Sequence, residues 1–267
     1  MKTKREEQIQ EAVRARYAGI AQGQADDCGC SPGSCCAPDA SSTQNPSVRL
    51  GYSLTELQMI PEGANLGLGC GNPQAIAGLQ LGEVVLDLGS GAGFDCFLAA
   101  RQVGPEGRVI GVDMTPEMIA KARANAARAA YGNVEFHLGE IEHLPVADSS
   151  VDVIISNCVI NLSTDKPGVF REALRVLRPG GRLAVSDVVA TAELPADIRE
   201  DLVLYSACAG GAATVAELQQ MLGDAGFEKI QIVPMDSSRE FIREWAPGRR
   251  LEDYIVSASI LARKASA

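Results

Sequence analysis

The chain has 267 residues, of which 46% are hydrophobic, and this is enough for one large α/β domain or one domain with a small appendage. Lysine and arginine total 24 against 34 aspartates and glutamates, and the formal charge of −10 argues against nucleic acid or an anionic membrane as the main partner. No apolar run approaches the ~20 residues that a membrane span needs, and the charged N-terminal stretch contains no apolar signal segment. We therefore expect a cytoplasmic protein that binds no membrane.

The N-terminal region divides into a helix and a cysteine-rich segment. Residues 4–22 carry small apolar residues at helical spacing between charges, which predicts a short amphipathic helix. Residues 23–47 are rich in Gly, Ser, Pro, Ala and Cys, and this composition predicts a mobile arm. We expect three parts: the helix and arm at 1–47, a cofactor-binding core at 48–190, and a C-terminal segment at 191–267 that completes the site and the sheet.

From Glu83 onward, strands and helices alternate. Continuous apolar runs that end in glycines, such as 84–90, are typical of strands buried on both faces. We expect strands over 84–90, 108–114, 134–139, part of 151–162, 182–189, 228–235 and 254–264. We expect helices over 95–103, 118–130 after a Thr115 cap, 166–181, and near 197–207 and 214–225. This order predicts an α/β fold with a doubly wound, mostly parallel, seven-stranded Rossmann-like sheet.

A glycine-rich loop follows the first predicted strand. Asp87, Gly89, Ser90 and Gly91 lie there, and glycines let the backbone approach a nucleotide-like ligand and turn sharply into the next helix. Asp113 ends the second strand, where a carboxylate can accept hydrogen bonds from ribose hydroxyls. The spacing is G-x-G-x-G rather than the G-x-G-x-x-G of nicotinamide enzymes. Asp87 would repel a pyrophosphate but suits a cationic ligand end, such as the ammonium group of a methionine moiety.

Residues after the next strands suit an adenine-containing ligand. Met114, Glu140 and Ile141 offer an adenine slot, and Asn157 ends the fourth strand at the same edge of the sheet. Together with the glycine loop, they predict S-adenosylmethionine as the cofactor. The pattern resembles the class I methyltransferase core, and LRPGGRLAVSD at 177–187 resembles that family's approach to strand five.

The eight cysteines indicate metal binding or redox chemistry rather than disulfides, because we expect an intracellular protein. Oxygen or nitrogen nucleophiles usually need a general base, but the two histidines, His137 and His143, are expected to be surface or packing residues. The order of the predicted strands and helices instead places three thiols near the cofactor. Cys158 follows strand four, Cys208 lies at a helix end beyond strand five, and Cys70 lies just before the core.

Five segments together resemble arsenite methyltransferases of the shorter bacterial kind. They are LGCGNP at 68–73, LDLGSGAGFDC at 86–96, VIGVDMTPEMI at 109–119, SNCVINLS at 156–163 and CAGGA at 208–212. The glycine loop alone is common to many families, whereas NCVINL and CAGGA in this order behind it are specific. The similarity runs from about Asn45 through Ala213.

The resemblance implies that Cys158 and Cys208 hold trivalent arsenic as thiolates and that Cys70 is a third ligand. The substrates would be arsenite and methylarsenite, and the arsenic lone pair would attack the sulfonium methyl group without a base. The family also implies an upstream cysteine that pairs with Cys70 as a disulfide. On one scheme this pair reduces a pentavalent methylated intermediate, and on another arsenic stays trivalent throughout. Thioredoxin or small thiols would reset the disulfide.

The arm offers four candidates where the family needs one upstream cysteine: Cys28, Cys30, Cys35 and Cys36. We favour Cys36, or its neighbour Cys35, as the partner of Cys70. The cluster could instead be a structural zinc knuckle, although its C-x-C and C-C spacings differ from those of ordinary zinc pairs. Cys96 is expected to be a small core residue.

Two other functions fit the same sequence. A class I methyltransferase acting on a quinone or another small molecule would carry the cysteines incidentally. A non-catalytic metalloid-binding protein would sequester arsenic without turnover, but the glycine loop and Asp113 argue against it. We favour arsenite methylation.

Overall fold

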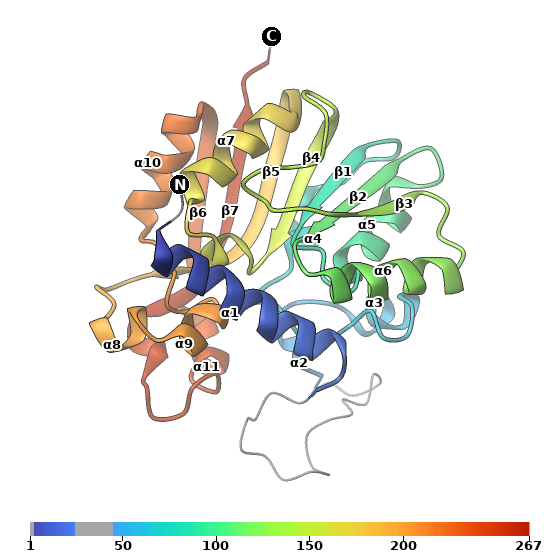
Figure 1. Cartoon of the computed structure of the whole chain (residues 1–267). Coiled ribbons are helices and arrows are strands. Elements are labelled where there is room, and N and C mark those ends of the chain that lie inside the picture. The colour runs from blue at the N-terminus through green and yellow to red at the C-terminus, as the bar shows by residue number, and fades with distance from the viewer. Residues whose placement is uncertain (1–2, 25–44, 267) are drawn as a thin grey trace.

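Seven strands form one sheet in the order β3-β2-β1-β4-β5-β7-β6 (Figure 1). The computed structural model describes residues 3–24 and 45–266. β7 runs antiparallel to both neighbours, β5 and β6, whereas the other pairs are parallel. The strands are β1 (Val84–Leu88), β2 (Arg108–Asp113), β3 (Val134–Leu138), β4 (Val151–Asn157), β5 (Leu177–Ala190), β6 (Phe227–Met235) and β7 (Ile255–Lys264). The predicted α/β fold with a doubly wound, mostly parallel, seven-stranded sheet is confirmed.

Helices cover both faces of the sheet and its carboxyl edge. They are α1 (Lys4–Ala21), α2 (Pro46–Arg49), α3 (Leu54–Met59), α4 (Pro73–Ala77), α5 (Phe94–Val103), α6 (Pro116–Arg128), α7 (Lys166–Val176), α8 (Ala196–Arg199), α9 (Leu202–Ser206), α10 (Val215–Ala225) and α11 (Arg239–Ile242). Short 3₁₀ turns lie at Ile160–Leu162, Asp236–Ser238 and Leu251–Asp253. Among the described helices, none combines the length and the apolar character needed to cross a membrane.

The apolar strand runs bury both faces of the sheet, as the sequence predicted. One buried cluster joins Leu86 and Leu88 of β1 to α7 and α10, and a second joins Val85 of β1 to α4, α5 and α6. Successive residues of β1 therefore point into opposite layers, which is the alternation that a strand requires. Parallel strands bring their carboxyl ends to one edge, and helix α1 crosses the molecule at that edge (Figure 1).

The sequence-based boundary of α7 is wrong at its C-terminal end. The helix ends at Val176, and the LRPGG segment already belongs to β5. Pro179 has no N–H for a helix, and Gly180 has a φ of +78°. The pairing with β4 shifts register here, since Leu177 faces Val151 and the next paired residue is Arg182.

The C-terminal segment also contains a break that the sequence did not reveal. The helix expected near 197–207 is two short helices, α8 and α9. Asp201 lies between them and its carboxylate accepts the N–H groups of Val203 and Leu204, so its side chain begins a new helix. The boundaries proposed at 47 and 190 stay predictions, and the four arm cysteines lie outside the described residues.

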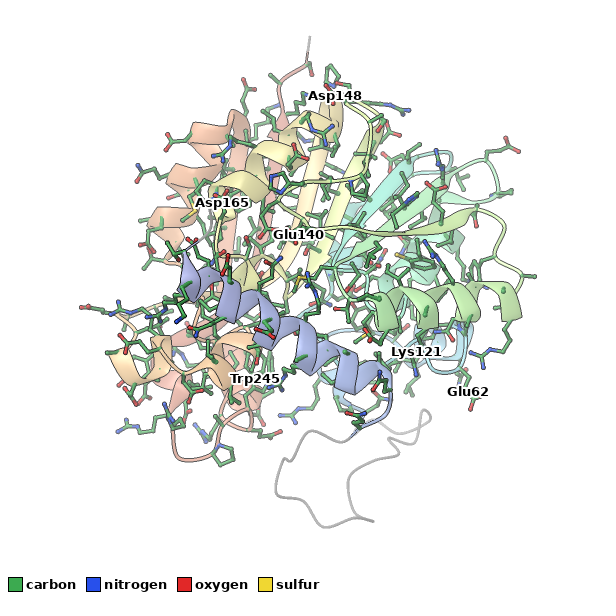
Figure 2. The ribbon with its side chains drawn as sticks, viewed as in Figure 1. Glu62, Lys121, Glu140, Asp148, Asp165 and Trp245 are labelled. Carbon is green, nitrogen blue, oxygen red and sulfur yellow. The ribbon has the colours of Figure 1, made fainter. Side chains whose placement is uncertain are left out.

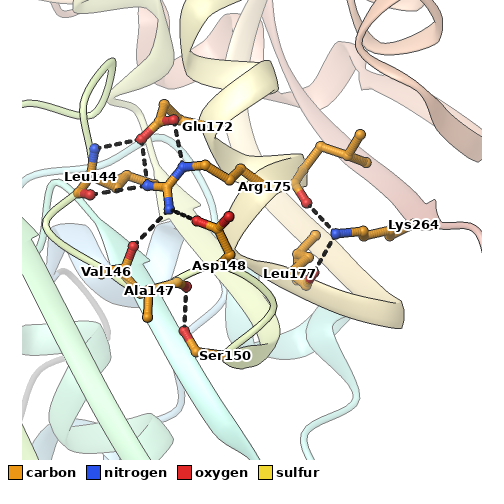
Figure 3. A network of polar contacts seen from close by, with 10 residues as sticks. Leu144, Val146, Ala147, Asp148, Ser150, Glu172, Arg175, Leu177 and Lys264 are labelled. Atoms are coloured by element: carbon orange, nitrogen blue, oxygen red, sulfur yellow. Dashed lines mark hydrogen bonds and ion pairs between the residues drawn. The ribbon is translucent and has the colours of Figure 1, made fainter.

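Arg175 fixes the loop that runs from the end of β3 to the start of β4 (Figure 3). Its guanidinium donates to both carboxylate oxygens of Glu172 at 2.7 Å and to the Asp148 carboxylate at 2.6 Å. It also donates to the backbone carbonyls of Leu144 at 3.1 Å and Val146 at 2.9 Å. The hydrogen bonds from Arg175 hold the pKa of Glu172 below its usual range. One side chain on α7 thus holds several groups of the loop that carries Ile141.

We expect Arg175→Met to lower the free energy of unfolding by about 1–3 kcal/mol, because two loop carbonyls lose their donor and the Glu172 carboxylate keeps only the N–H of Leu144. Arg171→Met on the same helix is the matched control. The Arg171 side chain is 63% exposed, and in the described part of the chain it forms one ion pair, with Asp165 at 3.7 Å, so its loss should cost less than about 0.5 kcal/mol. Denaturant unfolding of both variants measures the difference, and equal losses would show that the Arg175 network contributes nothing specific.

Candidate functional site

A cavity of about 370 Å³ lies at the carboxyl edge of the sheet. Most of the residues that the sequence singled out line it. They are Asp87, Gly89, Ser90, Gly91, Asp113, Met114, Ile141, Asn157, Cys158 and Cys208. Cys70 is buried beside the cavity rather than in its lining. Cys36 lies outside the described residues.

The glycine loop between β1 and α5 packs so closely against Val159 that Gly89 cannot carry a side chain. Gly89 has a φ of +71°, and a Cβ atom there would lie 2.4 Å from Cγ2 of Val159. The N–H of Gly91 donates to the Asp113 carboxylate at 3.0 Å. Between the two glycines, Ser90 Oγ is buried and has no hydrogen-bond partner in the described part of the chain. A buried hydroxyl without a partner is costly, so this atom favours a ligand in the cavity.

Asp113 is held at the end of β2 by backbone donors. Its second carboxylate oxygen accepts the N–H of Thr115 at 2.9 Å, and burial raises the pKa of Asp113. Thr115 occupies the N-cap of α6 as predicted, but its side chain makes no capping hydrogen bond. The carboxylate of Asp113 thus takes the place of a side-chain cap while it faces the cavity.

Asp87 and Asp95 add two more buried carboxylates to the lining. Burial and the nearby Asp95 raise the pKa of Asp87 well above its usual range, and the Cys96 thiol donates to Asp87 at 3.2 Å. Burial raises the pKa of Asp95 to about 6, although the Tyr52 hydroxyl donates to it at 2.8 Å. Neither carboxylate makes an ion pair within the described residues. A cationic ligand would stabilise both in their charged form.

Cys158 and Cys208 share an uncommon backbone conformation. Their φ angles are +60° and +65°, in the left-handed region that residues with a side chain rarely adopt. The N–H of Cys158 donates to the Ser186 carbonyl at 2.7 Å, and the N–H of Cys208 donates to the Tyr205 carbonyl at 3.0 Å. The Cys208 thiol in turn donates to the carbonyl oxygen of Cys158 at 2.7 Å. Local strain at two cysteines that face one cavity is typical of a functional site.

Cys70 reaches the same place from a different segment. Its Sγ lies within 4.8 Å of Cys158 Sγ. Its N–H donates to the Asn157 side chain at 3.0 Å, and its carbonyl accepts the Ser257 hydroxyl at 2.6 Å. A Cβ atom on the preceding Gly69 would lie 2.8 Å from the Asn157 amide, so only glycine fits there. Three thiols from distant parts of the chain are therefore brought together.

The three thiols are held in their neutral form. Burial raises the pKa of the Cys70 thiol. The hydrogen bond to Cys158 and then burial raise the pKa of Cys208 well above its usual range. For Cys158, the hydrogen bond from Cys208 lowers the pKa, but the contact with Cys70 and burial outweigh it. Neutral thiols suit a ligand that replaces each S–H proton on binding.

Helix α1 forms one wall of the cavity through Gln10, Val13, Arg16 and Tyr17. Burial and the nearby thiols of Cys208 and Cys158 raise the pKa of the Tyr17 hydroxyl, so this side chain lies close to Cys208. This contact could not be predicted from the sequence, because an amphipathic pattern identifies the buried face of a helix and not its partner.

Glu140 lies differently from the sequence-based expectation. It is not among the residues that line the cavity. Gln10 Nε2 donates to its carboxylate at 2.5 Å and Arg14 lies 3.7 Å away, so the side chain faces α1, as Figure 2 shows. Glu142, two residues further on, lines the cavity instead. Near the opposite side of α1 in the same view lies Trp245, which also lines the cavity (Figure 2).

Known proteins share this fold and much of this sequence. A family model described as a methyltransferase domain matches residues 79–226. An arsenite methyltransferase from Halobacterium salinarum is 55% identical over 264 residues, which cover 97% of this chain and 67% of the relative. The chain belongs to the arsenite methyltransferase family. Another member, from Aquipseudomonas alcaligenes, is 46% identical over 66% of this chain and 52% of its own length.

A solved structure supports the same family assignment. It is an arsenic(III) S-adenosylmethionine methyltransferase from Chlamydomonas reinhardtii, with a TM-score of 0.61 and 33% identity over 86% of this chain and 75% of the algal one. This member of the family therefore spans about two thirds of its halobacterial relative and about half of its pseudomonad relative.

The backbone at Cys158 yields a stability prediction for this family member. Because alanine pays the left-handed penalty and glycine does not, Cys158→Gly should be about 1 kcal/mol more stable than Cys158→Ala. Cys70 is the matched control, since its φ is not positive. There the glycine variant should be the less stable of the pair by about 0.5–1 kcal/mol. Thermal or denaturant unfolding without arsenic measures these stability differences. If Cys158→Ala were more stable than Cys158→Gly, the backbone at Cys158 would not be strained.

Proposed function

We propose that this chain transfers a methyl group from S-adenosylmethionine to trivalent arsenic bound by Cys70, Cys158 and Cys208. The observation that carries the proposal is the convergence of three buried thiols at a cavity lined by carboxylates. Cys158 and Cys208 line the cavity, and Cys70 Sγ lies behind them within 4.8 Å of Cys158 Sγ. The relatives support it, because the halobacterial and pseudomonad relatives are named arsenite methyltransferases and the algal structure is described as a methyltransferase of arsenic(III).

The cavity offers hydrogen-bonding and charged groups that suit S-adenosylmethionine. Within the described residues, Ser90 Oγ has no hydrogen-bond partner, and no cation pairs with the carboxylates of Asp87, Asp95 and Asp113 that line the cavity. S-adenosylmethionine carries a sulfonium and an ammonium group, and when bound it supplies an electrophilic methyl group.

In the proposed binding mode each part of the cofactor has its own residues. Asp113 accepts hydrogen bonds from the ribose, and Met114 and Ile141 contact the adenine. Asp87, Gly89, Ser90 and Gly91 hold the methionine end, with Asn157 beside them. Glu140 accepts a hydrogen bond from Gln10 of α1, so we propose that it holds this helix in place rather than contacting the adenine.

Arsenic binding needs no charged thiol. Each As–OH group of arsenite exchanges with one S–H group, forming an As–S bond and releasing one water molecule, so three exchanges give a neutral arsenic trithiolate. The raised pKa values of the three thiols suit this exchange, because a neutral ligand set enters and a neutral complex remains. Trivalent arsenic is soft and prefers sulfur to oxygen.

Arsenic itself is the nucleophile, since its lone pair remains after three As–S bonds have formed. No general base is then required, and neither histidine lines the cavity. We propose that the methylated arsenic is released or reduced with the help of an upstream thiol, for which Cys36 remains the candidate, and that thioredoxin or small thiols restore the reduced state. Methylarsenite would be a second substrate. Free catalytic thiols favour a reducing compartment, so we propose the cytoplasm.

The direct test is arsenic speciation after incubation of the full chain with arsenite, S-adenosylmethionine and a thiol reductant. We expect methylated arsenic with the wild type and a loss of at least about 100-fold in Cys158→Ser and in Cys208→Ser, because two ligands hold arsenic less firmly and aim it less well. Retained cofactor binding in both variants serves as the control for folding. Unchanged arsenite with the wild type, despite bound cofactor, would overturn the proposal and favour a different small-molecule substrate.

A further inference from the structure

Asp187 is a buried carboxylate beside the thiols that the proposed reaction does not yet use. It lies on β5, is only 2% exposed, and does not line the cavity. One of its carboxylate oxygens lies within 4.8 Å of both Cys70 Sγ and Cys158 Sγ. An arsenic atom bonded to both sulfurs, through bonds of ~2.3 Å as for other ions on thiolates, lies within roughly 6 Å of this oxygen.

The hydrogen bonds around Asp187 favour its anionic form, although burial raises the pKa of this carboxyl group to about 6. The N–H of Val188 donates to one oxygen at 2.8 Å, and the side-chain amide of Asn161 donates to the same oxygen at 2.9 Å. The backbone N–H of Asn161 approaches the other oxygen at 3.3 Å. Donors alone surround the carboxylate, and a carboxylate can only accept when it is ionised.

No cation pairs directly with Asp187 among the described residues. Lys166 contributes a favourable charge from a distance, but its ammonium group donates to the Ser163 carbonyl at 3.1 Å. A buried charge without a direct counter-ion is expensive, and proteins retain such groups mainly where they act on a ligand.

We infer that Asp187 stabilises the positive charge that reaches arsenic during methyl transfer, an inference that rests on the proposed function. In that step the sulfonium C–S bond breaks and its electron pair stays on sulfur, leaving a neutral thioether. The arsenic lone pair forms the As–C bond, so the neutral trithiolate becomes a cation. The charge thus moves from the cofactor to the side of the site where Asp187 lies. Asp187 does not bond to arsenic. Its charge acts on arsenic through space, past the sulfur atoms of Cys70 and Cys158, so we class it as a positioning residue.

Arsenic binding leaves the charge of Asp187 uncompensated. Trivalent arsenic on three thiolates is neutral, so the nearby carboxylate has no direct counter-charge among the described residues until the methyl group arrives.

The test compares Asp187→Asn with the wild type. Asparagine keeps the shape and an acceptor for Val188 but removes the charge. We expect the single-turnover rate of arsenite methylation to fall roughly 100-fold. Arsenite affinity, followed by fluorescence of Trp245, the chain's single tryptophan, should stay within about threefold, because the charge is needed only after binding. Asp152→Asn, on β4 and paired with Arg178 at 2.7 Å, is the matched control and should leave the rate unchanged.

Each outcome of these measurements supports or overturns the inference about Asp187. An unchanged rate in Asp187→Asn, with methylation by the wild type intact, overturns this inference and leaves the proposed function standing. Absence of methylation by the wild type overturns the proposed function itself. A parallel loss of arsenite affinity, or tight binding of zinc alone that depends on Asp187, would make it a ligand or a structural residue instead. Asp187→Ser removes the same charge with a smaller side chain and replaces Asp187→Asn if that variant does not fold.

Discussion

The cluster of three thiols depends on backbone geometry that ordinary side chains avoid. Cys158 and Cys208 both adopt the left-handed conformation, and hydrogen bonds to Ser186 and Tyr205 hold them there. The conformation ends β4 and α9 abruptly and turns each thiol toward the same wall of the cavity. Such strain, of order 1–3 kcal/mol for each residue, persists only where the surroundings enforce it. The rest of the chain provides those surroundings, because the parallel sheet brings the ends of β1, β4 and β5 to one edge.

Negative charge organises the other side of the site. Asp87 and Asp95 lie near the glycine loop at β1, Asp113 ends β2, and Asp187 lies on β5 beyond the thiols. Burial raises the pKa of each of these carboxyl groups, which records the cost of holding charge there without cations. A cationic methyl donor would offset that cost at β1 and β2. Transfer of its methyl group to arsenic would carry the positive charge across β4 toward Asp187.

The strands and the glycine loop could be predicted from the sequence because their signals are local. Apolar runs that end in Gly or Asp fixed the order of the strands, and the class I pattern identified the loop before α5. The helix boundaries near Leu177 and Asp201 could not be predicted, because they depend on pairing with β4 and on a side chain that competes for backbone N–H groups.

The thiols illustrate where local reasoning ends. Resemblance to a family singled out Cys70, Cys158 and Cys208, but their left-handed backbone and mutual contacts arise only from the tertiary fold. The prediction that Glu140 contacts the adenine failed for the same reason. Its carboxylate is hydrogen-bonded to Gln10 of α1, which lies more than 100 residues earlier in the chain. The carboxylates of Asp95 and Asp187 gave no sequence signal, because an aspartate in a helix or a strand is most often exposed.

X-ray absorption at the arsenic edge tests the central claim most directly. The full chain is loaded with arsenite under reducing conditions in a variant in which Cys28, Cys30, Cys35 and Cys36 are replaced by serine, so that only the buried thiols can bind. Three sulfur neighbours and no oxygen around arsenic are predicted. Adding Cys70→Ser should give two sulfurs and one oxygen. Oxygen neighbours in the first variant, or three sulfurs that require the arm cysteines, would contradict a site built from Cys70, Cys158 and Cys208.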